Sequence, residues 1–306
     1  MKRSIGIIGI GWVGSSIAMS ILQSGIADEL LLFDSNTQIA EGEAMDLSHG
    51  ASFYSAAEVK MVTIDEMLHA DVIVISAGRA GNASESRLNL LQENAKIIRS
   101  IGAQLTNYKG IVVVVTNPVD MLTKILTEIS KLPSHRVIGS GTILDTARLK
   151  QTLGKILNID PHSVHAQVIG EHGDSEVILW SSIKIGGVEL KNLKNWDITW
   201  QTKVDEEVRY AAYNIIQRKG ATNHAIGLAT AHLLKSILRD ERRVLTVSKV
   251  QDSIKELHGI ALSLPTIIGA KGAIDTLMPD MNAIEKDQLM SSANILIKAA
   301  ENLDRS

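Results

Sequence analysis

The stretch "SIGIIGIGWVG", residues 4–14, decides the fold of this 306-residue chain. Its first half is a short apolar run typical of a buried strand. Its second half places Gly9, Gly11 and Gly14 in the spacing G-x-G-x-x-G, directly before an expected helix. In that spacing Gly9 permits a tight turn, Gly11 lets a pyrophosphate approach the backbone, and Gly14 lets helix and strand pack closely. The N–H groups and the dipole of the helix N-terminus would then bind the anion.

A carboxylate stands where a dinucleotide site needs one. Asp34 ends the second apolar run, 20 residues after Gly14. In that place a carboxylate bonds a ribose 2′-hydroxyl and repels a 2′-phosphate, which favours NAD over NADP. A glycine turn with an incidental aspartate is the alternative, but the order of strand, glycines, helix and acid favours the cofactor site.

The apolar runs of the first half are continuous rather than alternating, as in strands that are buried on both faces of a parallel sheet. Amphipathic stretches separate them, several ending at a glycine. This order predicts a doubly wound α/β domain of the Rossmann type over residues 1–141. The strands are expected at 4–9, 29–34, 59–62, 70–76 and 110–115, and the helices at 14–24, 36–49, 87–107 and 118–130.

The pattern changes after residue 141, and residues 142–306 are predicted to form an α+β substrate domain that packs tightly on the first. The Gly186-Gly187 pair marks a hairpin turn. Helices are expected at 142–157, 200–219, 222–239 and 283–302, with strands at 163–170 and 176–190 and further strands between 243 and 268.

Composition excludes several classes of protein. The chain has no cysteine, which rules out disulfides, thiolate catalysis and Cys-ligated metal sites. A net charge of -3 gives no reason to expect nucleic acid or an anionic membrane as partner. No apolar run is long enough to span a membrane, and the apolar start is broken by glycines, so we expect a cytoplasmic protein.

The second half contains a candidate group for proton transfer. His172 lies in "GEHGDS" (170–175), just past an apolar strand, and histidine ionises near neutral pH. Asp145 and Arg148 lie three apart on an expected helix and share a face, where the simplest interpretation is a surface ion pair. No supporting carboxylate accompanies the nearby histidines 162 and 165, so no metal site is predicted.

Taken together, the chain resembles the L-lactate/malate dehydrogenase family over nearly its whole length. The matching stretches, in the same order, are G-x-G-x-x-G with Asp34, "ESRLNLL" (85–91), "TNPVD" (116–120), "GSGTILDTAR" (139–148), "GEHGDS" and "KGAT" (219–222). The resemblance implies an enzyme that uses NAD to interconvert a 2-oxo acid and an L-2-hydroxy acid.

The resemblance also implies a role for each matching residue. His172 would be the acid/base, Asp145 its imidazole partner and Arg148 the clamp on the substrate carboxylate. Arg87 would polarise the carbonyl, carried by a mobile lid within residues 76–91. Asn117 and Thr222 match substrate-lining positions. The residues implied to bind the cofactor are Gly9, Gly11, Val13, Gly14, Asp34, Gly78, Thr116 and Ser140.

The position that faces the substrate side chain in the family is Gly81 here. The family has glutamine there with pyruvate and arginine with oxaloacetate. Because Arg79 is out of register, malate dehydrogenase activity is the less favoured alternative. The missing side chain leaves room for longer apolar acids such as 4-methyl-2-oxopentanoate, as in the L-2-hydroxyisocaproate dehydrogenases. A non-catalytic NAD-binding sensor is a further alternative, but it predicts a broken catalytic set.

Two further residues match a regulatory site of the family. His165 and Lys150 occupy positions that bind fructose 1,6-bisphosphate at a subunit interface of allosteric bacterial lactate dehydrogenases, where arginine is usual in place of Lys150. They are therefore a candidate allosteric anion site. The resemblance also implies that the chain assembles with itself, as a homotetramer.

Overall fold

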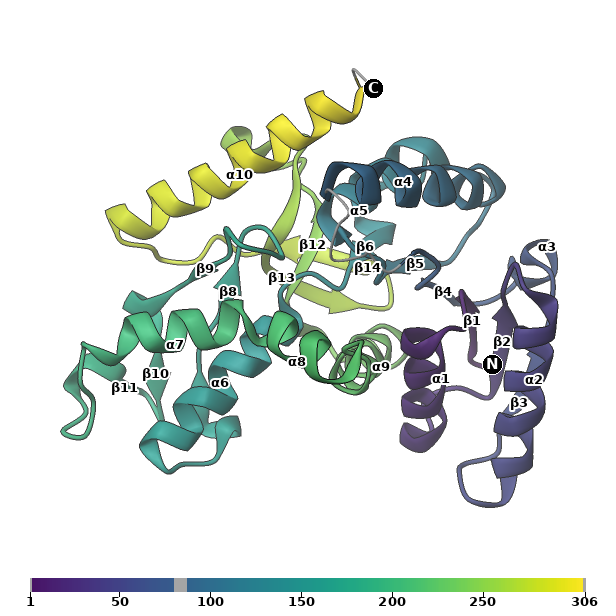
Figure 1. The fold of residues 1–306 in the computed structure, drawn as a ribbon, viewed down its shortest axis with the longest axis horizontal. Coiled ribbons are helices and arrows are strands. Elements are labelled where there is room, and N and C mark those ends of the chain that lie inside the picture. Colours follow the sequence, from purple (N-terminus) through teal and green to yellow (C-terminus); the bar gives the residue numbers. More distant parts are fainter. Residues whose placement is uncertain (1, 80–86, 305–306) are drawn as a thin grey trace.

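The computed structural model describes residues 2–79 and 87–304, without the side chains of Arg87 and Asp304. Helices and strands alternate through the first half of the chain (Figure 1). The elements of this half are β1 (Ser4–Ile8), α1 (Trp12–Ser24), β2 (Glu29–Phe33), α2 (Thr37–His49), β3 (Glu58–Met61), α3 (Ile64–Met67), β4 (Val72–Ile75), α4 (Arg87–Gln104), β5 (Ile111–Val114), α5 (Val119–Ser130) and β6 (Val137–Gly139).

These strands form a parallel sheet that the second half of the chain extends. The strand order is β14-β13-β12-β6-β5-β4-β1-β2-β3. The chain thus adds β2 and β3 on one side of β1 and then places β4 on the other side. The carboxyl ends of β1 and β4 lie side by side. In such sheets a ligand binds outside the carboxyl ends, at the point where the strand order reverses.

The inner parallel strands β1, β2, β4, β5 and β6 bury both of their faces, as the continuous apolar runs predicted, whereas β3 at the edge of the sheet is mostly exposed. Along β4, Val72 and Val74 pack towards α1, α2 and α9, whereas Ile73 and Ile75 pack towards α4 and α5. Successive side chains of a strand point to opposite faces, so a helix layer on each side requires apolar residues at every position. The predicted doubly wound fold is confirmed.

The second half contributes both an extension of this sheet and a separate core around α6. Its helices are α6 (Ile143–Leu157), α7 (Trp200–Arg209), α8 (Ala211–Lys219), α9 (His224–Leu238) and α10 (Ala283–Asp304). Its strands are β7 (Val164–His165), β8 (Val168–Ile169), β9 (Val177–Ile178), β10 (Lys184–Ile185), β11 (Val188–Glu189), β12 (Arg243–Val250), β13 (Ala261–Gly269) and β14 (Gly272–Thr276). None of the helices among the described residues is both long and apolar enough to cross a membrane.

Several details of the second half differ from the sequence-based prediction. The single helix expected at 200–219 is wrong, because the chain leaves helical geometry at Tyr210 and continues as α8. The strand expected at 163–170 is two strands in different sheets, and the stretch 176–190 holds three short strands. β6 and β14 were not predicted. Apolar patterning showed that these segments are extended but not which neighbours they pair with.

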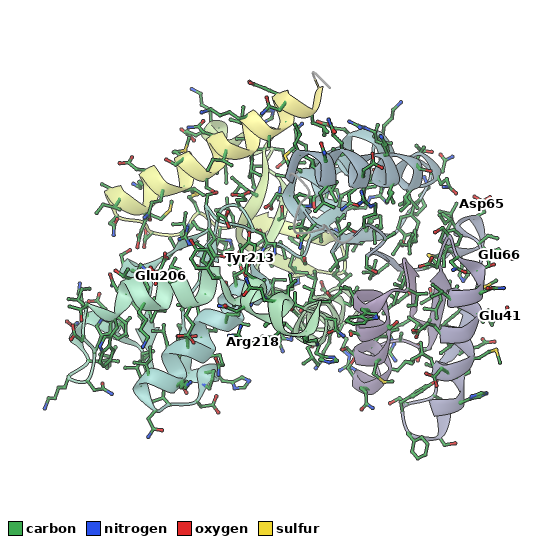
Figure 2. All side chains as sticks on the ribbon, in the orientation of Figure 1. Glu41, Asp65, Glu66, Glu206, Tyr213 and Arg218 are labelled. Carbon is green, nitrogen blue, oxygen red and sulfur yellow. The ribbon has the colours of Figure 1, made fainter. Side chains whose placement is uncertain are left out.

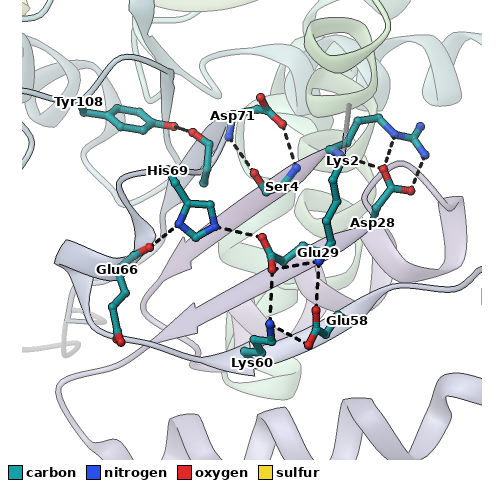
Figure 3. Close-up of polar contacts among 12 residues, drawn as sticks. Lys2, Ser4, Asp28, Glu29, Glu58, Lys60, Glu66, His69, Asp71 and Tyr108 are labelled. Carbon is teal, nitrogen blue, oxygen red and sulfur yellow. Dashed lines mark hydrogen bonds and ion pairs between the residues drawn. The ribbon is translucent and has the colours of Figure 1, made fainter.

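A polar network joins the amino ends of β1 to β4, at the edge opposite the expected site (Figure 3). The Glu29 carboxylate, only 10% exposed, accepts from Lys2 at 3.2 Å and lies 3.1 Å from His69 Nε2. Lys60 lies 3.6 Å from the same carboxylate. Burial would raise the pKa of Glu29, but its hydrogen bonds to His69 and Lys2 outweigh burial and lower it. Glu29 therefore stabilises this edge as a carboxylate.

We expect Glu29→Gln to lower the free energy of unfolding by about 1 kcal/mol, because its cationic partners are exposed and screened. A lowered pKa means that the stabilisation is complete above the ordinary value of 4.5 and is lost as the pH falls through the folded value. Urea titrations at several pH values measure this. Glu58→Gln, at an exposed carboxylate that pairs with the same two lysines, is the control and should cost less. An equal cost in both variants would contradict the interpretation.

Candidate active site

The glycine loop after β1 is shaped by close contacts that only glycine allows. A Cβ at Gly9, where φ is +92°, would lie 2.4 Å from the backbone of Ala77. A Cβ at Gly14 would lie 2.1 Å from the Gly9 carbonyl oxygen, so α1 starts in contact with the turn. At Gly11, by contrast, a Cβ would meet nothing within 4 Å, which leaves open space over the loop.

The start of α1 suits a bound anion. Gly11 is its N-cap and supplies no side-chain acceptor, so the first N–H groups of the helix remain available. Beside it, the Asp34 carboxylate accepts from the backbone N–H of Ile10 at 2.9 Å and of Asn36 at 2.9 Å. Asp34 thus fixes the end of β2 against the glycine loop, where a ribose would follow a pyrophosphate. The residues present fit an NAD molecule.

The ends of β4, β5 and β6 bring the other cofactor and substrate candidates to the same edge. Gly78 follows β4, and a Cβ there would lie 2.3 Å from the Thr116 methyl group. Thr116 donates its hydroxyl to the Ala77 carbonyl at 2.8 Å, and Ser140 follows β6 and is buried. Asn117, after β5, is joined to Pro118 by a cis peptide bond.

Asn94 of α4, which sequence analysis did not single out, ties two of these loops together. Its amide oxygen accepts from the Arg79 N–H at 2.8 Å, and its amide nitrogen donates to the carbonyls of Arg79 at 3.3 Å and Asn117 at 2.8 Å. Asn94 is fully buried between apolar positions of α4, such as Leu91 and Ala95. The sequence signal for Asn94 was a single amide among the apolar positions of a helix, because a buried amide requires hydrogen-bond partners.

The centre of the site is an ion triad around one carboxylate. His172 Nδ1 lies 2.6 Å from Asp145 Oδ2, and Arg148 Nη1 lies 2.7 Å from Asp145 Oδ1. The Asp145 side chain is 3% exposed, whereas those of Arg148 and His172 are 14% and 22% exposed. The pair at 145 and 148 is thus buried, not the surface ion pair that is the simplest interpretation of the sequence. The open sides of His172 and Arg148 can still meet a ligand.

The charges of the triad set its protonation. Burial would raise the pKa of Asp145, but the charges and hydrogen bonds of His172 and Arg148 lower it. Burial would lower the pKa of His172, but Asp145, with smaller contributions from Asp120 and Glu176, raises it to about 9. The imidazole is therefore protonated at neutral pH and can donate a proton from its other nitrogen.

Two more buried carboxylates surround this histidine. Asp120, in the first turn of α5, accepts from the backbone N–H of His172 at 2.7 Å. Glu176 is buried near Asp145, and burial together with that charge raises its pKa to about 8. Sequence analysis singled out neither residue. Asp120 was visible only as the last letter of "TNPVD", and nothing in the pattern showed that Glu176 turns inward.

Two helices of the second half, α8 and α9, contact the segments that carry the candidate site residues. Asn223, next to Thr222 and at the start of α9, donates to the Ser16 hydroxyl of α1 at 2.8 Å, which brings the "KGAT" stretch to the cofactor helix. Tyr213 of α8 lies at the centre of the molecule in Figure 2, and its hydroxyl donates to Asp174 at 3.3 Å, in the loop that carries His172. Thr222 itself is half-buried.

The remaining candidate residues either form no hydrogen bond or ion pair with the triad described above or fall outside the residues that the structure describes. Lys150 lies on α6 and is half-buried, and burial lowers its pKa; His165 is exposed on β7, which α6 packs against. Gly81 and the side chain of Arg87 lie outside the described residues, as do residues 80–86 of the expected lid. Among the residues described, His, Asp and Glu form no cluster of three or more that could hold a metal ion.

Comparison with known proteins gives a consistent family. Residues 3–139 match the family model described as the lactate/malate dehydrogenase NAD binding domain, and residues 142–305 match the lactate/malate dehydrogenase alpha/beta C-terminal domain. The chain is 41% identical over 302 residues to the L-lactate dehydrogenase of Salinibacter ruber, covering 96% of each chain. It is 42% identical to that of Kosmotoga olearia, covering 98% of this chain and 96% of the relative.

Solved structures agree. The minor L-lactate dehydrogenase of Enterococcus mundtii, in a ligand-bound form, superposes with a TM-score of 0.95 at 35% identity, covering 99% of this chain and 98% of the other. A lactate dehydrogenase from a Medee basin deep-sea metagenome library gives the same TM-score at 34% identity, covering 99% and 100%.

Proposed function

The chain belongs to the lactate/malate dehydrogenase family, and from that premise we propose that it reversibly reduces a 2-oxo acid to an L-2-hydroxy acid with His172 as the acid/base. It is an NAD-dependent oxidoreductase that acts on the CH–OH group of 2-hydroxy acids. The observation that carries the proposal is the buried triad of His172, Asp145 and Arg148 at the end of the sheet that holds the glycine loop.

The chemistry of the reduction divides between the cofactor and the chain. NADH, when bound, supplies the hydride for the substrate carbonyl carbon. The protonated His172, held through Nδ1 by Asp145, gives the proton from Nε2 to the carbonyl oxygen. Because the charges and hydrogen bonds of His172 and Arg148 outweigh burial and keep Asp145 ionised, its carboxylate both orients the ring and stabilises the imidazolium.

Two arginines are needed because one guanidinium cannot meet both ends of the substrate. Arg148 is assigned the carboxylate, since its planar fork can make two parallel bonds to a planar anion. Arg87 is assigned the carbonyl oxygen, where charge develops in the transition state. Asn117 and Thr222 are assigned to the substrate wall. Gly9, Gly11, Val13, Gly14, Asp34, Gly78, Thr116 and Ser140 are assigned to NAD.

The variant Arg148→Lys tests this assignment, because lysine keeps the charge beside Asp145 but cannot make the paired contact. We expect kcat/KM for the 2-oxo acid to fall by roughly 100-fold, with KM for NADH and the melting temperature nearly unchanged. Steady-state kinetics followed by NADH absorbance measure this. Arg209→Lys is the control, since Arg209 pairs with Asp205 and the loop carbonyl of Asp174. Near-normal kcat/KM in Arg148→Lys would remove Arg148 from the substrate.

Gly81 is proposed to set the substrate side chain. By resemblance this position faces the group attached to the carbonyl, and glycine leaves room and no charge there. Longer apolar acids should therefore be accepted, and a second carboxylate should find no partner. The relatives from Salinibacter ruber and Kosmotoga olearia are L-lactate dehydrogenases, so turnover of pyruvate is also expected.

A panel of three substrates on one preparation tests the role of Gly81. We expect kcat/KM for 4-methyl-2-oxopentanoate to equal or exceed that for pyruvate, and oxaloacetate to be the poorest substrate. Gly81→Arg should raise the value for oxaloacetate, because a guanidinium can pair with its second carboxylate, whereas Gly81→Gln, at the same place without charge, should not. A clear preference of the unaltered enzyme for pyruvate would assign selectivity to another residue.

The enzyme is also proposed to be a homotetramer with an anion site between subunits. Large apolar side chains remain exposed on the α1, α2 and α9 surface, including Trp12 at 63%, Met45 at 56% and Leu228 at 66%. Exposed large apolar side chains on neighbouring helices favour burial against another copy. Lys150 and His165 are assigned to fructose 1,6-bisphosphate by resemblance alone.

Light scattering should give four times the mass of one chain. Leu228→Lys should lower this mass by burying a charge in the interface, whereas Phe53→Lys, at an apolar side chain that is 85% exposed, should not. On the same preparation, fructose 1,6-bisphosphate should lower the half-saturating concentration of the 2-oxo acid, and Lys150→Ala should abolish that response. An unchanged mass in Leu228→Lys would place the interface elsewhere, and an unchanged half-saturation would remove the anion site.

A further inference from the structure

His172 is held at two points, and only one of them is its ring. The ring contacts Asp145 of α6, while the backbone N–H donates to Asp120 of α5 at 2.7 Å. The preceding residue, Glu171, donates its N–H to the Ser292 hydroxyl of α10 at 2.8 Å. The loop 170–175 is therefore held by contacts with α5, α6 and α10. The contact that fixes the backbone of His172 itself is a hydrogen bond to the Asp120 carboxylate.

We propose that Asp120 is a positioning residue for the reaction: its hydrogen bond fixes the backbone of His172, and its negative charge helps to keep the imidazole protonated. This proposal rests on the proposed function in one respect, the role of His172 as proton donor. The two contacts of His172, with Asp120 and with Asp145, are formed within the chain and do not depend on a bound substrate.

Burial distinguishes Asp120 from an ordinary helix-capping acid. The residue is 2% exposed, and among the described residues its Oδ1 has no hydrogen-bond partner. A buried carboxylate with one unsatisfied oxygen is costly, and a neutral residue of similar size would avoid that cost. A charge maintained at such a place, 2.7 Å from the backbone of the acid/base, fits a role in the reaction better than a role in packing.

The groups that face Asp120 partly offset the effect of burial on its pKa. They are the Ser248 hydroxyl of β12 and, in the loop, His172 and Glu171. Burial, and to a smaller extent the Glu171 charge, raises the pKa of Asp120, while Ser248 and His172 lower it, and the balance lies at about 6. Above that pH the Asp120 carboxylate adds to the larger effect of Asp145 in raising the pKa of His172.

Asp120→Asn separates the two parts of the proposal, because its amide oxygen can still accept from His172 while the charge is gone. We expect the pKa of His172 to fall by roughly one unit, the lower end of the effect of a nearby opposite charge. Reduction needs the protonated ring, so kcat/KM falls as the pH rises through about 9, and in the variant this decline should occur at correspondingly lower pH. NMR titration measures the imidazole directly, with the His172 signal assigned among nine histidines by its absence in His172→Gln.

Asp120→Leu tests the hydrogen bond, since it keeps the volume but leaves the His172 N–H without an acceptor. We expect kcat to fall at least about 10-fold with KM for NADH unchanged. Glu128→Gln is the control for both variants: it removes one charge from the other end of α5, where Glu128 is exposed and pairs with Lys124, and should change neither quantity.

An unchanged pKa of His172 in Asp120→Asn would overturn the electrostatic part of the proposal, and normal kcat in folded Asp120→Leu would overturn the positioning part. If Asp120→Leu does not fold, the titration of Asp120→Asn still decides whether the charge acts on His172. A wild-type enzyme that reduces no 2-oxo acid would count against the proposed function, and the NMR titration reports on Asp120 independently of that result.

Discussion

The structure depends on a carboxylate that water barely reaches. Asp145 is 3% exposed and would cost several kcal/mol to bury as an isolated anion. His172 at 2.6 Å and Arg148 at 2.7 Å compensate that charge, and each is held in place by it. Because removal of either cation would leave one buried oxygen of Asp145 without its partner, the three residues form one unit. The start of α6 and the loop 170–175 must therefore stay in register with each other.

The parallel sheet explains how distant segments supply this unit. β1, β4, β5 and β6 all point their carboxyl ends to one edge, so the glycine loop, the Gly78 loop and the Asn117 loop meet there although they are far apart in sequence. Asn94 then fixes two of these loops to each other with a single fully used amide. Rigid strands set the coarse positions, and buried polar side chains set the fine ones.

The sequence predicts best those features that depend on residues close to one another along the chain. Continuous apolar runs and the glycine spacing report burial and turns directly, so most strands and helices of the first half were predicted to within a few residues, although the short elements α3 and β6 were missed. The ladder between β12 and β6 consists of one residue pair, Ser248 with Gly139, and no local pattern connects the two segments. Tyr210 breaks a helix without Gly or Pro nearby, so nothing in the stretch signalled it. Inward-turned acids such as Glu176 carry no periodic signal either.

Charge balance supports the proposal that a second arginine acts in the site. At neutral pH, Asp145 and Asp120 are anionic, Glu176 is neutral because burial and the neighbouring Asp145 raise its pKa to about 8, and His172 and Arg148 are cationic. These buried charges cancel before any substrate enters. A 2-oxo acid brings one further negative charge into a site that water leaves, where an unpaired charge is costly. The cation that Arg87 is proposed to supply restores the balance. A substrate with a second carboxylate would require yet another cation, and the glycine proposed to face its side chain carries no charge.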